Sequence, residues 1–400
     1  MGSPDCLMKR RTFLATSVAS SLALHPAWSA AAAKTRVAVI GHTGHGNFGH
    51  GLDAMWLDIP ETEIVGVADA DPKGLAGALK KLKLDKGFAD YRQMLKDTRP
   101  EIVAIGPRHI DQHHEMAMAA IEAGVRGIYM EKPFMPTLVQ ADEVIAACEK
   151  HGTRLALAHR NRYHPVLPLL KKRVAEGTIG RPLEYRVRGK EDARGGSLDL
   201  WVLGSHLFNL VHYFAGDPRA CIATVYQDSR LVTKMDVKEG AEGIGPLAGN
   251  EVHARFEMAD GLPAFFDSVQ NAGTKTAGFG VQIIGTEGII DLRIDEEPVA
   301  HLLAGSPFDP VATPRAWVPI TTAGIGKIET VENIRKLVGG HVAPGRDLIA
   351  AIREEREPLC SAKDARVTLE MTMGIFESHR LHGQRVELPL KDRQHPLTRL

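Results

Sequence analysis

Between residues 35 and 158 the chain alternates short apolar runs with longer amphipathic stretches. The apolar runs lie at 37–40, 63–68, 102–105, 127–130 and 154–158 and resemble strands buried on both faces of a parallel sheet. The stretches between them predict helices near 91–95, 111–123 and 136–151. Repeated strand–helix units of this length predict a doubly wound, Rossmann-type parallel sheet.

From residue 183 onward, apolar and polar residues alternate with a period of two. The alternation predicts strands at 184–190, 221–227, 252–258, 263–269, 279–284 and 288–294, with helices at 345–354 and 362–382. Such strands form a largely antiparallel sheet with one packed face. The predicted fold class is α/β, with a Rossmann-type domain at 34–158, an α+β substrate domain at 159–390 and a tail at 391–400.

The first 33 residues have the composition of an export signal. Lys9, Arg10 and Arg11 precede a short apolar run and then a stretch of small residues. We expect a twin-arginine signal peptide at 1–33 and a periplasmic or other extracytoplasmic location, with an uncleaved anchor or a disordered tail as the alternative. No other run reaches the roughly 18 apolar residues of a membrane span, so we expect no stable one.

The charge balance argues for a small-molecule partner. The chain has 49 Lys and Arg residues against 49 Asp and Glu residues, so it has no bulk attraction for nucleic acid or anionic membranes. Its four cysteines include no CxxC pair and are expected to be buried apolar residues. The alternative is that two of them form one disulfide.

A glycine-rich turn follows the first predicted strand and indicates a dinucleotide site. The glycine pattern typical of dinucleotide-binding turns, G-x-G-x-x-G, starts at Gly44, and a similar glycine spacing starts at Gly41. With either start, backbone amides and the N-terminus of a following helix can approach a pyrophosphate. The histidines of this loop are not expected to bind a metal, because a glycine-rich loop is a poor rigid cage. The expected cofactor residues are Gly41, Thr43, Gly44, Gly46, Asn47, Phe48, Gly49, Asp69, Glu131 and Lys132.

Asp69 indicates which dinucleotide is bound. It ends the second predicted strand, 20 residues after Gly49, where a carboxylate binds ribose hydroxyls and repels a 2′-phosphate. We therefore expect NAD rather than NADP, unless Asp69 is only a turn residue before Asp71 and Pro72.

Several motifs in order resemble the glucose–fructose oxidoreductase/inositol dehydrogenase (Gfo/Idh/MocA) family. Glu131-Lys132-Pro133 follows the strand at 127–130, and further matching stretches lie at 161–165, 204–206 and 356–360. The resemblance covers about residues 36–390. It implies a nucleotide-dependent oxidoreductase acting on a sugar, polyol or related carbinol, and a homo-oligomer built through the C-terminal sheet. An exported enzyme has no soluble nicotinamide pool, so we expect a tightly held dinucleotide.

Lys132 and His206 are the expected catalytic residues. Lys132 stands at the carboxyl end of a parallel strand, where its ammonium group can stabilise a forming alkoxide, unless it is simply solvated. The resemblance implies that His206 acts beside it, with a buried core histidine as the alternative. The aspartates that accompany this histidine in the family are Val202 and Asn209 here. Asp199, seven residues before His206 and thus on the same face of an α-helix, is expected to take the acidic role.

Polar residues at the domain junction and on the first strand of the second domain are expected to bind substrate. They are Arg160, Arg162, Arg188, Lys190 and His206, with Arg194 near the same strand as a further candidate. Two other functions stay open at this point. Some exported members of the family are NAD-dependent glycoside hydrolases that oxidise the sugar transiently, and some bind dinucleotide without turnover. The glycine-rich stretch at 239–249 is expected to be a lid or a linker.

Overall fold

The computed structural model describes residues 33–273, 279–311 and 313–400. The chain divides into a unit at Met1–Ala33 and a compact unit at Lys34–Leu400. The predicted signal peptide lies outside the described residues, apart from Ala33. Everything below concerns the unit at Lys34–Leu400.

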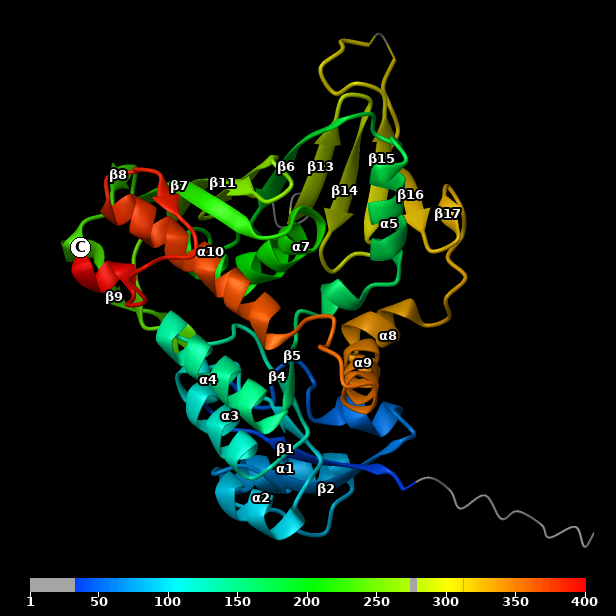
Figure 1. Cartoon of the computed structure of the whole chain (residues 1–400), viewed down its shortest axis with the longest axis vertical. Coiled ribbons are helices and arrows are strands. Elements are labelled where there is room, and N and C mark those ends of the chain that lie inside the picture. The colour runs from blue at the N-terminus through cyan, green and yellow to red at the C-terminus, as the bar shows by residue number, and fades with distance from the viewer. Residues whose placement is uncertain (1–32, 274–278, 312) are drawn as a thin grey trace, which may run out of the picture. The chain divides into compact units, whose positions relative to one another are not determined.

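A five-stranded parallel sheet forms the N-terminal half of this unit, as predicted (Figure 1). Its strand order is β2-β1-β3-β4-β5, and each strand ends in a run of buried residues. The strands are β1 (Thr35–Ile40), β2 (Thr62–Ala68), β3 (Ile102–Ile105), β4 (Gly127–Met130) and β5 (Arg154–Leu157). The helices between them are α1 (Pro72–Leu82), α2 (Tyr91–Thr98), α3 (His113–Glu122) and α4 (Leu138–His151).

The strand order reverses between β1 and β3, which defines where a ligand can enter. In open parallel sheets the crevice lies beyond the carboxyl ends of the two strands at this switch point. The loops that follow β1 and β3 meet there, since the amide of Arg108 donates a hydrogen bond to the carbonyl of Gly46.

One expectation for this region is wrong. The glycine-rich turn is not followed directly by an α-helix but by the 3₁₀ segment η1 (Ala54–Asp58). Asn47, Gly49 and Gly51 all have positive φ, which interrupts the right-handed backbone that an α-helix requires. No α-helix N-terminus is therefore available at this turn, and the amides of Asn47 and Gly49 donate to the carbonyls of His42 and Gly46 within the turn.

The second half of the unit is built on one large sheet. Its strand order is β17-β16-β15-β14-β13-β6-β12-β11-β7-β18, with β8 paired to β7, and only β6 and β12 run parallel. The strands are β6 (Pro182–Arg188), β7 (Pro218–Gln227), β8 (Arg230–Leu231), β11 (Glu251–Met258), β12 (Pro263–Val269), β13 (Gly280–Gly285), β14 (Gly288–Arg293), β15 (Ala300–Ala304), β16 (Val318–Thr321), β17 (Gly324–Ile325) and β18 (Val386–Glu387).

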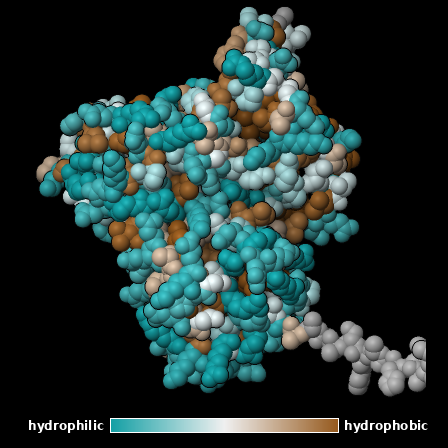
Figure 2. Space-filling model, viewed as in Figure 1, coloured by the Kyte–Doolittle hydropathy of each residue, from teal (hydrophilic) through white to brown (hydrophobic). Residues whose placement is uncertain are grey.

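Helices cover one face of this sheet. Buried and half-buried residues alternate strictly along β11 and β12, so one face is packed and the other is open. The long helix α10 (Ala362–Arg380) and α7 (Ser205–Ala215) pack on the buried face. α5 (Val166–Ala175) precedes the sheet in the chain. The surface in Figure 2 is mostly hydrophilic, with small scattered apolar groups.

The two halves are interleaved rather than consecutive. α8 (Ile334–Gly339) and α9 (Val342–Arg353) come after the second sheet, yet α9 packs on β4 and β5 of the first (Figure 1). The stretch 391–400, predicted as a tail, is also folded onto the unit. His395 stacks against the rings of Trp201 and Phe376, and Arg393 bonds both Asp142 of α4 and Glu370 of α10.

The glycine-rich stretch at 239–249 forms a small hairpin. β9 (Lys238–Glu239) pairs with β10 (Pro246–Leu247), and the 3₁₀ segment η6 (Ala241–Gly243) lies between them. A Cβ on Gly243 would come within 2.4 Å of an Asp111 carboxylate oxygen. The hairpin therefore reaches across to the loop after β3. Among the described residues, no helix has both the length and the apolar character needed to cross a membrane.

Candidate functional site

The glycine-rich turn is shaped so that only glycine fits at its central positions. A Cβ on Gly46 would come within 2.2 Å of the Arg108 backbone nitrogen, and one on Gly49 within 2.4 Å of the Gly106 carbonyl oxygen. Both glycines also have positive φ. The turn and the loop after β3 thus approach each other closely, which leaves a backbone cradle of the kind that a pyrophosphate requires.

Asp69 lies in the wall of a cavity of about 330 Å³ beside this turn. Its carboxylate is 1% exposed and accepts hydrogen bonds from the Thr43 amide, the Thr43 hydroxyl at 2.6 Å and the Asp71 amide. Asp69 therefore braces the turn as well as lining the cavity. The other lining residues are Gly41, His42, Ala68, Ala70, Ala89, Asp90, Tyr91, Arg92, Gln112, Glu115 and Met116.

A second cavity, of about 180 Å³, lies where the parallel sheet meets the C-terminal part. It brings together Lys132 after β4, Arg160 after β5, Lys190 after β6 and His206 of α7. Of the residues predicted from sequence to act on substrate, these four line it. The remaining lining residues are His50, Glu131, Ala158, Arg194, Leu203, Phe279, Ile294, Asp295 and His341.

The floor of this cavity is a buried ionic cluster. Glu131 is fully buried, and its carboxylate is hydrogen-bonded by the imidazole of His50 and by the Lys132 amide. Burial alone would raise the pKa of Glu131, but the hydrogen bond and charge of His50 and the charge of Lys132 lower it to about 2. Glu131 is therefore an anion at neutral pH.

Lys132 is held from the opposite side by a backbone carbonyl. Lys132 is 7% exposed, and its ammonium group donates a hydrogen bond to the Val202 carbonyl oxygen at 2.9 Å. Burial lowers the pKa of Lys132, and the charge of Glu131 opposes that shift. Val202 lies in η4 (Leu200–Gly204), a π-helical turn inserted between α6 (Ser197–Asp199) and α7. π-Helical turns disturb the regular carbonyl pattern and occur often at functional sites.

His206 faces the cavity as a neutral imidazole. Burial, and then the charge of Lys132, hold its pKa well below the usual range. Its Nδ1 lies 3.5 Å from Nδ1 of His159, whose pKa burial and the same ammonium group lower to about 3. A neutral imidazole has a lone pair, so His206 can accept a proton from a bound hydroxyl.

Asp199, the expected acidic partner of His206, does not line this cavity. It is buried and accepts hydrogen bonds from the Ser268 hydroxyl at 2.7 Å and the Glu191 amide at 3.1 Å, and it is not among the residues that line the cavity. The expected shared face with His206 assumed an uninterrupted α-helix. The π-helical turn between them winds more residues into each turn, so seven residues no longer make two turns.

Two of the five expected substrate residues also lie outside the cavity. Arg162 donates to the carbonyl oxygens of Asn209 and Leu359 and to Asp364, and Arg188 pairs with Glu191. The Arg162 guanidinium braces the fold, whereas Arg188 is exposed and forms a local ion pair three residues along the chain.

Arg194, the further substrate candidate after β6, also lines the cavity. Two other lining residues had no expected role at a substrate site: His50, which directly follows the glycine-rich turn, and His341, which precedes α9. The Nδ1 atom of His341 lies 2.6 Å from the Tyr129 hydroxyl, and burial lowers the pKa of this histidine to about 4. A cluster of histidines spread over the chain carries no local periodicity, so no pattern in the sequence could have assembled it.

Within the described ranges, one group of side chains has metal-ligand spacing. His45, His109 and Asp111 bring three ligand atoms within 4.8 Å of one another. His45 Nε2 already lies 2.9 Å from both carboxylate oxygens of Asp111, which accounts for this contact as an ordinary hydrogen bond.

A parallel nucleotide-binding sheet, a glycine cradle at its switch point and a buried lysine at its carboxyl edge define the class of NAD-binding oxidoreductases. The family models agree. Residues 35–159 match the NAD-binding Rossmann fold of the Gfo/Idh/MocA oxidoreductases, and residues 171–388 match their C-terminal alpha/beta domain. The chain belongs to the Gfo/Idh/MocA oxidoreductase family.

Curated relatives include sugar dehydrogenases. The chain is 25% identical over 364 residues to a D-apiose dehydrogenase of Paraburkholderia graminis, covering 88% of this chain and 90% of the relative. It is 26% identical over 265 residues to a levoglucosan dehydrogenase of Pseudarthrobacter phenanthrenivorans, covering 58% of this chain and 66% of the relative.

Solved structures share the fold over most of the chain. Levoglucosan dehydrogenase in complex with NADH and levoglucosan has a TM-score of 0.69 at 21% identity, covering 89% of this chain and all of that one. An oxidoreductase from Agrobacterium radiobacter in complex with NAD+, L-tartaric acid and magnesium has a TM-score of 0.65 at 18% identity, covering 88% and 98% of the two chains.

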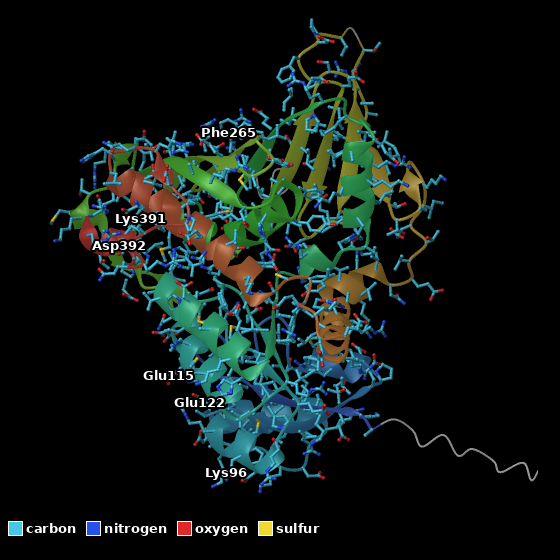
Figure 3. All side chains as sticks on the ribbon, viewed as in Figure 1. Lys96, Glu115, Glu122, Phe265, Lys391 and Asp392 are labelled. Atoms are coloured by element: carbon cyan, nitrogen blue, oxygen red, sulfur yellow. The ribbon has the colours of Figure 1, made fainter. Side chains whose placement is uncertain are left out.

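Replacing Glu131 tests the ionic cluster. Glu131→Gln leaves the Lys132 ammonium and His50 without a buried anion, and breaking a buried charge pair costs about 3–5 kcal/mol. We expect the free energy of unfolding, measured by urea denaturation, to fall by about that amount. Glu122→Gln on the outer side of α3 is the matched control and should change it by less than about 0.5 kcal/mol (Figure 3). Equal losses of unfolding free energy in the two variants would show that the buried ionic cluster does not stabilise the fold.

Proposed function

We propose that the chain is an NAD-dependent dehydrogenase that oxidises a carbinol of a sugar, a polyol or a related compound. The observation that carries the proposal is the cavity in which buried Lys132 and neutral His206 face the same space at the carboxyl edge of the sheet. Its relatives by sequence include a D-apiose dehydrogenase and a levoglucosan dehydrogenase, which supports a carbohydrate substrate.

The residues present fit a dinucleotide. The turn at Gly46 and Gly49 has no room for a side chain, so it presents only backbone to its surroundings, as a turn that approaches a pyrophosphate must. The dinucleotide would be held by the turn from Gly41 to Gly49, which includes Thr43, and by Glu131 and Lys132 after the end of β4. When bound, the nicotinamide supplies the hydride acceptor.

The chain's own residues then handle the hydroxyl. Lys132 donates a hydrogen bond to the substrate oxygen, which orients it and stabilises the alkoxide character that grows as the C–H bond breaks. His206 accepts the hydroxyl proton on its free ring nitrogen. The carbinol carbon loses a hydride and its oxygen loses a proton, so a carbonyl product forms. Asp199 has no role in this step, because it bonds Ser268 and the Glu191 amide.

We propose NAD rather than NADP as the cofactor because Asp69 presents a buried carboxylate to the cavity beside the glycine-rich turn. A 2′-phosphate close to this carboxylate would be repelled. Arg92 lines the same cavity. The preference for NAD over NADP therefore depends on whether the adenosine ribose lies closer to the Asp69 carboxylate or to the Arg92 guanidinium.

We also propose that the protein is exported by the twin-arginine route with its dinucleotide in place. The support is the order of Lys9, Arg10 and Arg11 before a short apolar run and a stretch of small residues. Fractionation of expressing cells with and without the twin-arginine translocase measures this. Mature protein in the cytoplasm of both strains would contradict it.

A homo-oligomer formed through the second sheet is proposed as well. The open face of that sheet carries Ile222, Phe265 and Arg255 among paired charges, and Phe265 lies under the Arg186 guanidinium at 4.1 Å. Apolar and arginine side chains of this kind are common in interfaces. Light scattering gives the mass in solution, and a monomer at micromolar concentration would rule the proposal out.

Substituting Lys132 tests the dehydrogenase. Lys132→Ala should lower kcat by about 10²–10³-fold, because a preorganised donor to the developing oxyanion is lost, while NAD affinity stays within a few-fold. Lys96→Ala, on the outer side of α2, is the control and should keep the wild-type rate (Figure 3). Activity is followed by nicotinamide absorbance over a panel of sugars, polyols and glycosides. Full activity of Lys132→Ala, or release of aglycone with no reduced cofactor, would contradict the proposal.

Substituting Asp69 tests the cofactor preference. Asp69→Asn removes the charge and keeps an acceptor for Thr43, so the ratio of NAD to NADP affinity should narrow by about 10–100-fold. Thr43→Val removes the Thr43 hydroxyl that donates to Asp69 without changing the charge, and should leave that ratio within about threefold. Calorimetric affinities for both dinucleotides decide it. A ratio that is the same in Asp69→Asn and in the wild type means that Asp69 only braces the turn.

A further inference from the structure

His341 lines the candidate substrate cavity from the connection between α8 and α9, and the reaction proposed above does not use it. The residue is 2% exposed and shares this cavity with Lys132 and His206. Its backbone is left-handed, with a φ of 60° and a ψ of 14°, a conformation that few residues other than glycine, asparagine, aspartate and histidine adopt. The partners of its two ring nitrogens decide what this histidine can offer to a ligand.

One ring nitrogen of His341 is bonded to a tyrosine behind the cavity wall. Its Nδ1 atom lies 2.6 Å from the hydroxyl oxygen of Tyr129 on β4, and the two rings meet edge to face with 5.8 Å between their centroids. Tyr129 is fully buried, is not among the residues that line the cavity, and packs edge to face against Trp56. Packing thus fixes the tyrosine, and the tyrosine fixes the imidazole.

The proton in this hydrogen bond comes from the tyrosine. Burial, and then the charge of Glu131, raise the pKa of Tyr129 well above its usual value, so the phenol keeps its proton. Within the described ranges, the only hydrogen bond of this hydroxyl is the one to His341. If Nδ1 were the donor, the tyrosine proton and the Nε2 lone pair would both be buried without a partner. If the tyrosine donates, only Nε2 lacks one, and this is the less costly arrangement.

His341 is therefore a neutral imidazole with its proton on Nε2. Burial lowers its pKa to about 4, so the ring holds a single proton at neutral pH. Because Nδ1 accepts the Tyr129 proton, the ring's own proton is on the other nitrogen. The Nε2 atom is buried and has no hydrogen-bond partner in the described part of the chain. It is an N–H donor without an acceptor, on the edge of the ring that faces away from Tyr129.

The nearest carboxylate of the cavity does not accept from this donor. The charge of Glu131 acts on the pKa of His341, but its oxygens accept hydrogen bonds from His50 and from the Lys132 amide. His206 and His341 thus differ in function, because His206 offers a lone pair and His341 offers an N–H group. Buried donors without a partner are uncommon in native proteins, and one in a cavity wall is satisfied when a ligand oxygen binds there.

We propose that His341 Nε2 donates a hydrogen bond to a second oxygen of the substrate, on the carbon next to the carbinol that Lys132 binds. Tyr129 and His341 would then make the enzyme specific for vicinal diols. The proposal rests on the dehydrogenase function proposed above and narrows its substrate class. The cavity, at about 180 Å³, is smaller than the roughly 300–1,000 Å³ typical of drug-sized ligands. The two oxygens that contact Lys132 and His341 therefore have to lie close together on the ligand.

The protonated nitrogen can be measured without any substrate. Nitrogen-15 NMR of the full chain labelled at histidine, with the His341 signals assigned by their loss in His341→Asn, shows which ring nitrogen carries the proton. We expect the form protonated on Nε2 at neutral pH, because the Tyr129 hydroxyl donates to Nδ1. A His341 ring protonated on Nδ1, or on both nitrogens, would overturn the proposal.

Substitutions at position 341 separate the donor from the rest of the side chain. His341→Asn suits the left-handed backbone and keeps an acceptor for Tyr129 at the place of Nδ1, but it removes the outward donor. His341→Gln puts an amide donor near the place of Nε2. His382→Asn is the matched control, because His382 is an exposed histidine whose φ is also positive, at 59°.

The probes differ in a single hydroxyl. D-Glucose, D-galactose and D-xylose are compared with their monodeoxy analogues by kcat/KM and by calorimetric affinity, with the full chain loaded with NAD. Wild type and His382→Asn should prefer the intact sugar by about 10–100-fold over the analogue that lacks the hydroxyl next to the oxidised carbon, because that analogue leaves the buried donor unpaired. This ratio should fall to within about threefold in His341→Asn and recover in part in His341→Gln, with NAD affinity unchanged.

The outcomes distinguish this proposal from the dehydrogenase itself. A ratio that is the same in wild type and His341→Asn would overturn the contact, and a loss of NAD affinity in His341→Asn would assign the donor to the cofactor instead. Calorimetric discrimination that depends on His341 without cofactor reduction would contradict only the dehydrogenase. Cofactor reduction at equal rates with intact and deoxy sugars would contradict only the contact at His341.

Discussion

The buried ammonium group of Lys132 is the constraint on which the site depends. A lysine that is 7% exposed is stable only if a counter-charge and hydrogen-bond acceptors come with it. Glu131 supplies the charge from the adjacent position, and the Val202 carbonyl supplies the acceptor from the other half of the unit. The ammonium thereby joins the edge of the parallel sheet to the helix that carries His206. Burying this ammonium group costs desolvation free energy. The same burial places the charge in a low-dielectric space, where it acts strongly on a developing oxyanion.

The second determinant is the π-helical turn at Leu200–Gly204. It lies within a continuous helical stretch from Ser197 to Ala215 and changes which residues share a face. His206 points into the cavity, and Asp199 turns towards Ser268 on β12. The family resemblance led us to expect an aspartate at position 202, and Val202 contributes its backbone carbonyl to Lys132 there. A backbone carbonyl thus accepts the hydrogen bond from Lys132 at the position where the family resemblance led us to expect a carboxylate.

The interleaving of the two halves keeps the cavity walls in place. α9 returns to cover β4 and β5, and Arg393 near the C-terminus ties α4 to α10. The cavity wall that carries Lys132 and the wall that carries Lys190 and Arg194 therefore belong to one packed unit. A site whose charges come from both walls can keep its geometry without a ligand, because each charged group is braced by its own packing and hydrogen bonds.

The sequence by itself determined the elements and the one lysine that local pattern could mark. β3, β4 and β12 occur at the predicted residues because apolar periodicity is a local property, and Lys132 was singled out because the Glu131-Lys132-Pro133 motif follows a predicted strand. Periodicity could not foresee the π-helical turn, so Asp199 was placed on the wrong face. Nor could it show that Arg162 donates to distant backbone carbonyls or that His50 and His341 join the cavity. Those assignments depend on contacts between residues tens to hundreds of positions apart, and only tertiary packing decides which buried charges meet.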